Sequence, residues 1–424
     1  MTAAVQHIDV VPAPSAASRW MSGWRGALAW GVGIALLHRI VLMIWLPVAW
    51  GILGGNLNDG NPDFHTARAD IPILTEPAQQ RIFGVWRRWD AVHYLDLATN
   101  GYRPENAGST VFGYVTPAGI AAINVIIGDI DVAAAVFETI MFAAALVLLI
   151  RFCEVYFNDA ALGRWSAIIT ALLPLSFFFA APMSEAPFLC FSIAALYAGA
   201  RGRWLAAGIL GLLATLTRSQ GVLLAAPLGL MLLQAALRES TSRRGQLIHV
   251  IRGGLPLLLL PAAYFAFDLT RQRLLGLPSL SDTYATYSYI FFTNPLEGMI
   301  INFRWFVERP AQAFTNIDLL ILVAALVLAV AATIWRVHRR LALQAYTWIS
   351  LALFFSKSNY EFGTQIVYYS QSTGRYTMIL FPLAIALADM LRRAHGVVRL
   401  LALAGMTLLL LLLSALYTLA LAGP

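Results

Sequence analysis

The chain has 424 residues, of which 59% are hydrophobic and only 12% are charged, and its formal net charge is +7. Soluble domains are about 25% charged and about 45–50% apolar, so this composition excludes a secreted, cytosolic or disulfide-rich fold. Several apolar runs are long enough to cross a hydrocarbon core of about 30 Å. The sequence therefore predicts an all-α fold, a polytopic bundle of transmembrane helices.

The basic residues are scattered over the loops between apolar runs, with no basic stripe interleaved with aromatic residues. This pattern argues against a nucleic-acid partner and indicates a topology signal instead. Cys153 and Cys190 give no spacing for a disulfide framework or a metal site. We expect no cofactor, and the metal requirement stays open. Lys357 is the only lysine, which, with the abundance of Ala and Leu, hints at a GC-rich bacterial genome.

Arginine clusters in short loops fix the expected topology, because the positive-inside rule places such loops in the cytoplasm. We expect one membrane domain over 1–424, with a cytoplasmic tail over 1–25 and external loops over 51–130 and 275–316. The eleven expected spans are 27–50, 131–150, 165–181, 185–200, 204–217, 220–237, 254–274, 317–335, 342–356, 376–391 and 397–421. The apolar stretch 111–128 is expected to lie at the outer interface or dip into it, since a full span there would reverse every later loop.

The stretch from Thr75 to Tyr102 predicts one amphipathic helix within the first external loop. Thr75 followed by Pro77 is a helix start, and Asn100 followed by Gly101 is a helix stop. The apolar side that we expect at the membrane interface is formed by Ile82, Val85, Trp86 and Trp89.

Asp90 and His93 lie three residues apart on this predicted helix and are expected to be neighbours. A carboxylate beside an imidazole on an external helix can supply a general base. The alternative is that Asp90 only pairs with Arg87 or Arg88 on a solvated face.

Three more polar groups are expected at the outer mouths of the spans. They are Glu185 in PMSEAPF, Arg218 in TRSQG and Arg375 in QSTGRY. Burying a charged side chain in a membrane is costly unless it is paired or has a function. The expected position of all three groups on the same side of the membrane as Asp90 therefore favours a functional site. The alternatives are that the arginines reach lipid headgroups and that Glu185 caps a helix.

These strings together resemble the PIG-V family, the second mannosyltransferases of glycosylphosphatidylinositol assembly and their bacterial relatives. The likeness lies in WDAVHYL, LPLSFFFAAPMSEAPF, LTRSQG and GRY, in that order, over roughly residues 86–382. It implies a GT-C membrane glycosyltransferase that uses a polyprenyl-phosphate sugar. Asp90 would be the first-loop carboxylate, His93 its motif neighbour, Glu185 the acid of the SE pair and Arg218 the arginine of the TRS string.

The chemistry of such a donor requires only one carboxylate, because a phosphate monoester, with its second pKa near about 6, is a good leaving group. Asp90 would take the proton of the acceptor hydroxyl, while Arg218 and Arg375, with Arg88 behind them, hold the phosphate. Tyr376 completes the expected substrate-binding set.

We therefore expect an inverting mannosyltransferase on the outer face of a bacterial plasma membrane. Its partners would be a polyprenyl-phosphate-mannose donor lipid, a lipid-linked or cell-envelope glycolipid acceptor and membrane lipids. The alternative from another class is a transporter or flippase of a lipid-linked sugar, which should bury acids near the bilayer midplane. Here only Glu138 and Asp268 are expected deep in the membrane. The aromatic residues of 284–292 are expected to form an interfacial belt, with a groove for the prenyl chain as the alternative.

Overall fold

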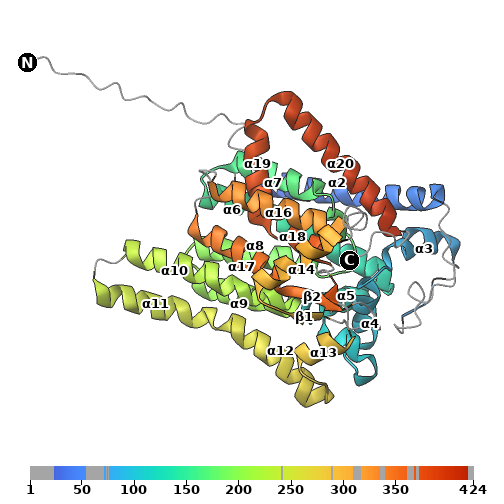
Figure 1. Cartoon of the computed structure of the whole chain (residues 1–424), viewed down its shortest axis with the longest axis horizontal. Helices are drawn as coiled ribbons and strands as arrows, with labels where there is room; N and C mark the ends of the chain where they lie inside the picture. The colour runs from blue at the N-terminus through green and yellow to red at the C-terminus, as the bar shows by residue number, and fades with distance from the viewer. Residues whose placement is uncertain are drawn as a thin grey trace, which may run out of the picture.

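The computed structural model describes residues 23–53, 71–72, 74, 76–239, 242–287, 290–308, 317–334, 340–360, 367–368 and 372–418. The chain is a bundle of helices with one small sheet (Figure 1). The prediction of an all-α polytopic membrane protein is confirmed. Residues 1–22 of the predicted cytoplasmic tail lie outside the described residues.

Six helical segments of the described chain are long and apolar enough to cross a membrane. They are α2 (Gly23–Ile52), α6 (Ile130–Tyr156), η5 (Ser219–Leu224) with α10 (Ala225–Glu239), α11 (Arg243–Leu257) with α12 (Leu259–Leu275), α16 (Ile317–Ile334) and α20 (Gly396–Thr418). Shorter apolar helices are α7 (Ala160–Leu172), α8 (Glu185–Ala200), α9 (Trp204–Thr217) and α17 (Leu341–Ser356). With α19 (Phe381–Arg393), a helix lies at the place of each expected span, but the count of eleven stays a prediction.

Several expected segments differ in detail. The predicted span 376–391 is interrupted, because one short helix ends at Met378 and α19 begins only at Phe381. The predicted span 165–181 is a helix only to Leu172, two residues before Pro174, because the residue before a proline is driven out of the helical region. The chain continues as η4 (Ser176–Phe179). The stretch 111–128 forms η3 (Pro104–Val111) and α5 (Val115–Ile127), which are bent by 111° into a broken span or a re-entrant loop.

The arginine-rich ends of the helices gather at one end of the bundle. The backbone N–H of Gly23 at the start of α2 donates to Glu154 near the end of α6, at 3.0 Å. Arg392 at the end of α19 pairs with Asp159 at the start of α7, at 2.7 Å. The end of α10 and the start of α11 lie on the same side as the start of α2, while α3 (Pro77–Ile82), α4 (Ala91–Asn100) and α13 (Leu280–Tyr287) lie at the other (Figure 1).

Small residues let the helices of the bundle approach closely. A Cβ at Gly31 of α2 would lie 2.7 Å from the backbone nitrogen of Val147 in α6. A Cβ at Gly208 of α9 would lie 2.2 Å from the carbonyl oxygen of Pro256 in α11. Van der Waals packing across such contacts is a main source of helix association within a bilayer.

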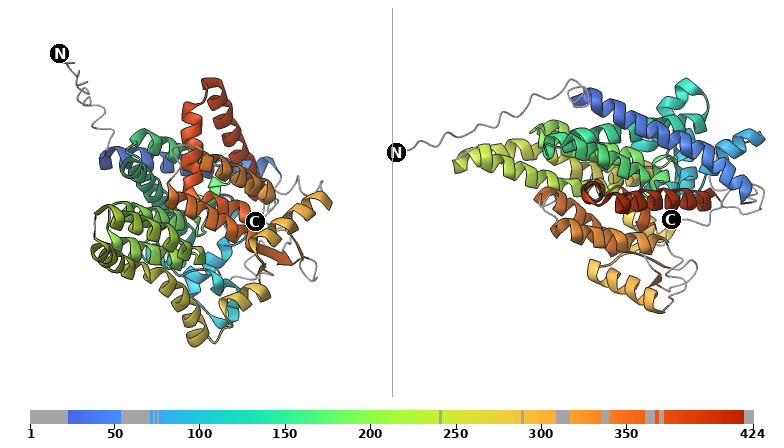
Figure 2. Two further views of the ribbon diagram at one scale, coloured as in Figure 1. Left: turned by 60° about the vertical axis from the view of Figure 1, so that its left-hand side comes forward. Right: turned by 90° about the horizontal axis from the view of Figure 1, so that it is seen from above.

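The end opposite the arginine clusters carries an antiparallel sheet that the sequence did not predict. Its order is β1 (Ile290–Phe292), β2 (Lys357–Tyr360) and β3 (Val367–Tyr368). Ile290 faces Asn359 and Phe292 faces Lys357 across β1 and β2. The sheet, with α14 (Pro295–Glu308), lies beside α17 on one side of the bundle (Figure 2).

Candidate active site

The predicted single helix over 75–102 is broken into three pieces, which corrects the expectation from the sequence. Thr75 lies outside the described residues, and α3 begins at Pro77. A short turn, η2 (Gly84–Trp86), follows, and α4 begins only at Ala91. Trp89 between them has a φ of 53°, in the left-handed region. The predicted stop is confirmed, because α4 ends at Asn100 and Gly101 follows with a φ of 75°.

A long-range ion pair accompanies this break. The guanidinium of Arg87 donates to both carboxylate oxygens of Asp131, at 2.8 and 2.5 Å, and to the carbonyl oxygen of Pro72 at 2.6 Å. Val85 and Trp86, expected at the membrane interface, are buried in the core instead. The predicted apolar face is therefore divided, with only Ile82 and Trp89 exposed.

The break places Asp90 at the start of α4, where its carboxylate forms an ion pair with Arg375. The expected alternative, a pair with Arg87 or Arg88, is not present. Burial raises the pKa of Asp90, but the charge and hydrogen bond of Arg375 outweigh it, so this pKa lies below its ordinary value. Asp90 is therefore an anion that keeps about a quarter of its side chain exposed.

A second ion pair lies directly behind the first. Arg218 donates to Glu185 at 2.5 Å, and the same carboxylate oxygen lies 3.6 Å from Nε of Arg375. Ser184 accepts hydrogen bonds from Arg218, at 2.8 Å, and from the hydroxyl of Tyr94, at 2.7 Å. Both arginines are largely buried, so they do not reach lipid headgroups, and Glu185 bridges them rather than only capping a helix.

The short helix α18 (Thr373–Met378), which carries Arg375, is anchored by Asp318 at the start of α16. Asp318 accepts from the backbone N–H groups of Ser372 and Gly374, both at 2.9 Å. A Cβ at Gly374 would lie 2.4 Å from the Asp318 carboxylate, so only glycine fits without a shift. This contact fixes the direction in which Arg375 points.

These groups border a cavity with an open volume of about 770 Å³. Its lining includes Asp90, Tyr94, Phe112, Gly113, Arg218, Tyr284, Lys357, Asn359, Arg375 and Tyr376. The ring of Tyr376 lies 4.6 Å from the Arg218 guanidinium, 5.0 Å from the Lys357 ammonium and 5.3 Å from the Arg375 guanidinium. Among the described residues, one carboxylate and three cations therefore line one polar cavity.

Three expected site residues do not line this cavity. Glu185 lies behind its arginines. His93 shares a hydrogen bond of 2.7 Å with Ser109 and stacks on Phe112, and its charge is one of the causes that lower the pKa of Asp90. Arg88 donates to the carbonyl oxygen of Thr418 in α20, at 3.1 and 2.9 Å, so the structure does not bring it to the phosphate position that we expected.

Lys357 and Tyr94 line the cavity but were missing from the predicted set. Lys357 is largely buried, and burial lowers its pKa. The signal in the sequence was the position of the only lysine, directly after the apolar run 342–356. Tyr94 lies within the WDAVHYL string, but neither its residue type nor its spacing marks it as a site residue.

An apolar cavity with an open volume of about 980 Å³ adjoins the polar one. The two share Ser219, Gln220, Tyr284, Ile290, Lys357 and Tyr376. Val222, Leu223, Leu280, Phe292, Leu353 and Phe354 line only the apolar cavity. Of the aromatic residues over 284–292, Tyr284 and Phe292 thus reach a groove, while Tyr289 lies outside the described residues.

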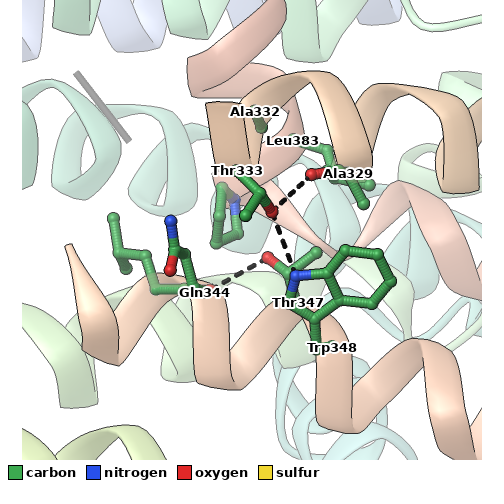
Figure 3. Close-up of a pocket in the computed structure, with 9 residues that line it drawn as sticks. Ala329, Ala332, Thr333, Gln344, Thr347, Trp348 and Leu383 are labelled. Atoms are coloured by element: carbon green, nitrogen blue, oxygen red, sulfur yellow. Dashed lines mark hydrogen bonds between the residues drawn. The ribbon is translucent and has the colours of Figure 1, made fainter. Parts of the chain in front are cut away.

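A third pocket lies between α16, α17 and α19, and its described lining offers no candidate catalytic residue (Figure 3). The Thr333 hydroxyl donates to the carbonyl of Ala329, at 2.8 Å, and accepts from the Trp348 indole, at 3.1 Å. No titratable side chain lines this pocket. Within the described part of the chain, no group of three His, Cys, Asp or Glu residues could hold a metal ion.

The chain matches a known protein family over about half of its length. The family model described as Mannosyltransferase (PIG-V) matches residues 56–270. This range includes Asp90, His93, Glu185 and Arg218 but ends before Arg375. No curated protein matches the chain.

Proposed function

This chain belongs to the mannosyltransferase (PIG-V) family, and on that premise we propose that it transfers mannose from a polyprenyl-phosphate-mannose lipid to a lipid-linked or cell-envelope glycolipid. The observation that carries the proposal is the convergence of Asp90, Arg218 and Arg375 on one polar cavity. They come from three distant parts of the chain, and the family model covers the first two.

The proposed reaction is an in-line displacement at the anomeric carbon. The acceptor hydroxyl oxygen forms a bond to this carbon, while the bond from the carbon to the donor phosphate oxygen breaks with its electron pair. Asp90 takes the hydroxyl proton, for which its ionised state is required. The products are a mannoside of inverted configuration and a polyprenyl phosphate.

Arg218 and Arg375 would stabilise the charge that grows on the leaving phosphate. Each is already held by a carboxylate, which fixes the guanidinium before substrate binds. Such preorganised donors act more strongly in a site shielded from water. Glu185 then has a positioning role, because one of its oxygens contacts both arginines.

The adjoining apolar cavity supports a prenylated donor of the GT-C type. It meets the polar cavity at Tyr284, Ile290 and Tyr376, and most of its wall is apolar. A lipid that carries a sugar phosphate at one end and a hydrocarbon chain at the other matches a polar cavity next to an apolar one. We assign the chain of the donor to this cavity.

We further propose that the site faces the outside of the plasma membrane. In support, α4 and α13, which contribute residues to the cavity lining, lie at the end opposite the arginine-rich helix ends (Figure 1). Single cysteines in place of the exposed residues Glu105 and Arg243 test the orientation. A membrane-impermeant maleimide should label position 105 in intact cells and position 243 only after lysis, and the reverse pattern would invert the proposed topology.

Purified protein in proteoliposomes should transfer radiolabel from polyprenyl-phosphate-mannose to a component of a cell-envelope lipid extract. The same proteoliposomes separate this function from the flippase alternative. A flippase would move labelled lipid between leaflets without forming a glycosidic bond. Translocation without a labelled product would refute the proposed transfer.

A further inference from the structure

One face of the small sheet contributes residues to both cavities, and its side chains change from polar to apolar between the polar cavity and the apolar one. Residues directly opposite in antiparallel strands project to the same face, as do residues two apart in one strand. Ile290 and Phe292 of β1 therefore share a face with Asn359 and Lys357 of β2. Asn359 lines only the polar cavity and Phe292 only the apolar one, while Ile290 and Lys357 line both.

Among the described residues of the site, Lys357 is the one cation that lines both cavities. Arg218 and Arg375 line the polar cavity but not the apolar one. Their guanidinium groups are also engaged by the carboxylates of Glu185 and Asp90. A lysine has a flexible apolar stem and a compact charge, so its stem can lie along hydrocarbon while its ammonium faces a polar group.

The side chain of Lys357 is only 6% exposed, and its nitrogen lies beside the ring of Tyr376. Of the charged residues described in the lining of the polar cavity, one is a carboxylate and three are cations, which suits an anionic group. A phosphate joined to a hydrocarbon chain would place its charge where the two cavities meet.

We propose that Lys357 binds the phosphate of the lipid-phosphate substrate at the junction of the two cavities, with its stem against the first units of the chain. This inference rests on the proposed function and adds a residue to its binding site. In this arrangement Lys357 positions the leaving group between the chain and the two arginines. The sheet register fixes its place, because Lys357 lies opposite Phe292.

The test is a binding measurement with polyprenyl phosphate, the proposed product, on purified protein in detergent. Lys357→Met keeps the length and apolar stem but removes the charge, and Lys357→Arg keeps the charge. Loss of a charge-assisted hydrogen bond should weaken binding of polyprenyl phosphate by a factor of about 10–100 in the methionine variant. The arginine variant should stay within a few-fold of wild type, and the unphosphorylated polyprenol should bind all three proteins equally.

Two further measurements fix the interpretation. The thermal unfolding midpoint reports whether each variant folds, and Lys357→Gln replaces the methionine variant if that protein does not purify. Phosphatidylinositol binding tests whether the phosphate comes instead from a phospholipid. Wild-type affinity of the neutral variants for polyprenyl phosphate, or a loss confined to phosphatidylinositol, would overturn the assignment.

Failure of the proposed function gives a different result. In that case the wild-type protein itself neither transfers mannose nor binds polyprenyl phosphate better than polyprenol. Normal transfer and phosphate binding in wild type, with no change on loss of the Lys357 charge, would overturn only the role of Lys357.

Discussion

Replacing Asp90 with asparagine tests the proposed base with little change in shape. The amide keeps the size of the carboxylate but cannot accept a proton. Loss of a positioned general base lowers turnover by a factor of about 10²–10⁴. At about 1.36 kcal/mol for each tenfold change, this corresponds to about 2.7–5.4 kcal/mol in the activation free energy.

The KM for donor distinguishes a base from a purely structural residue, because loss of a structural support for Arg375 would raise this KM. Arg375 loses its pair with Asp90 in the variant but keeps its contacts with Glu185, at 3.6 Å, and with the sulfur of Met183, at 3.5 Å. It therefore stays in place with more of its charge available to the donor phosphate. The KM for donor should stay unchanged or fall while kcat collapses.

The assay measures mannose transfer in proteoliposomes over a range of donor concentrations. Asp389→Asn is a matched control, because Asp389 is also buried and ion-paired, with Arg392 and Arg393 at the arginine-rich end of the bundle. We expect near-wild-type kinetics from this control. A normal kcat in Asp90→Asn with a raised KM would refute the base and leave Asp90 as a support for Arg375.

Three other perturbations follow from the same contacts. Arg218→Ala or Arg375→Ala should each lower kcat by a factor of about 10² or more, and variants that fold normally with wild-type rates would remove these residues from the site. Gly374→Ala should force Asp318 aside at a cost of about 1–3 kcal/mol, seen as a lower unfolding midpoint with reduced transfer; an unchanged midpoint would contradict the contact. The acid limb of kcat/KM should lie below about pH 4 in wild type, because activity is lost as pH falls through the lowered pKa of Asp90. In Arg375→Met this pKa rises, so the limb of the residual activity should move to higher pH by about 1–3 units, and an unmoved limb would assign it to another group.

The sequence identifies the polar residues of the site because they interrupt apolar surroundings. Glu185, Arg218 and Arg375 were selected at the mouths of predicted spans, and the structure brings them to Asp90. Which acid meets which arginine could not be predicted, because it depends on how distant helices pack. Of the further lining, Tyr376 is expected as part of the GRY string, and Tyr284 is expected only under the alternative of a groove for the prenyl chain.

The failures of prediction have a common physical cause, which is contact between distant segments. Periodicity over 75–102 favours a continuous helix, yet Arg87 binds Asp131, 44 residues away. Lys357 reaches the cavity because β2 pairs with β1. Its partner in that pairing, Phe292, lies 65 residues earlier in the chain. Neither contact leaves a local signal in the residues beside it.

The last helix holds the segment that precedes Asp90. The hydroxyl of Tyr417 donates to the carbonyl oxygen of Trp86, at 3.1 Å, while Arg88 binds the carbonyl oxygen of Thr418. These contacts join residues about 330 positions apart. A chain inserted from its N-terminus exposes Asp90 early in synthesis but gains this support only when α20 enters the membrane. We therefore expect the site to assemble late, because an incomplete chain lacks the contacts that hold the segment before Asp90 in place.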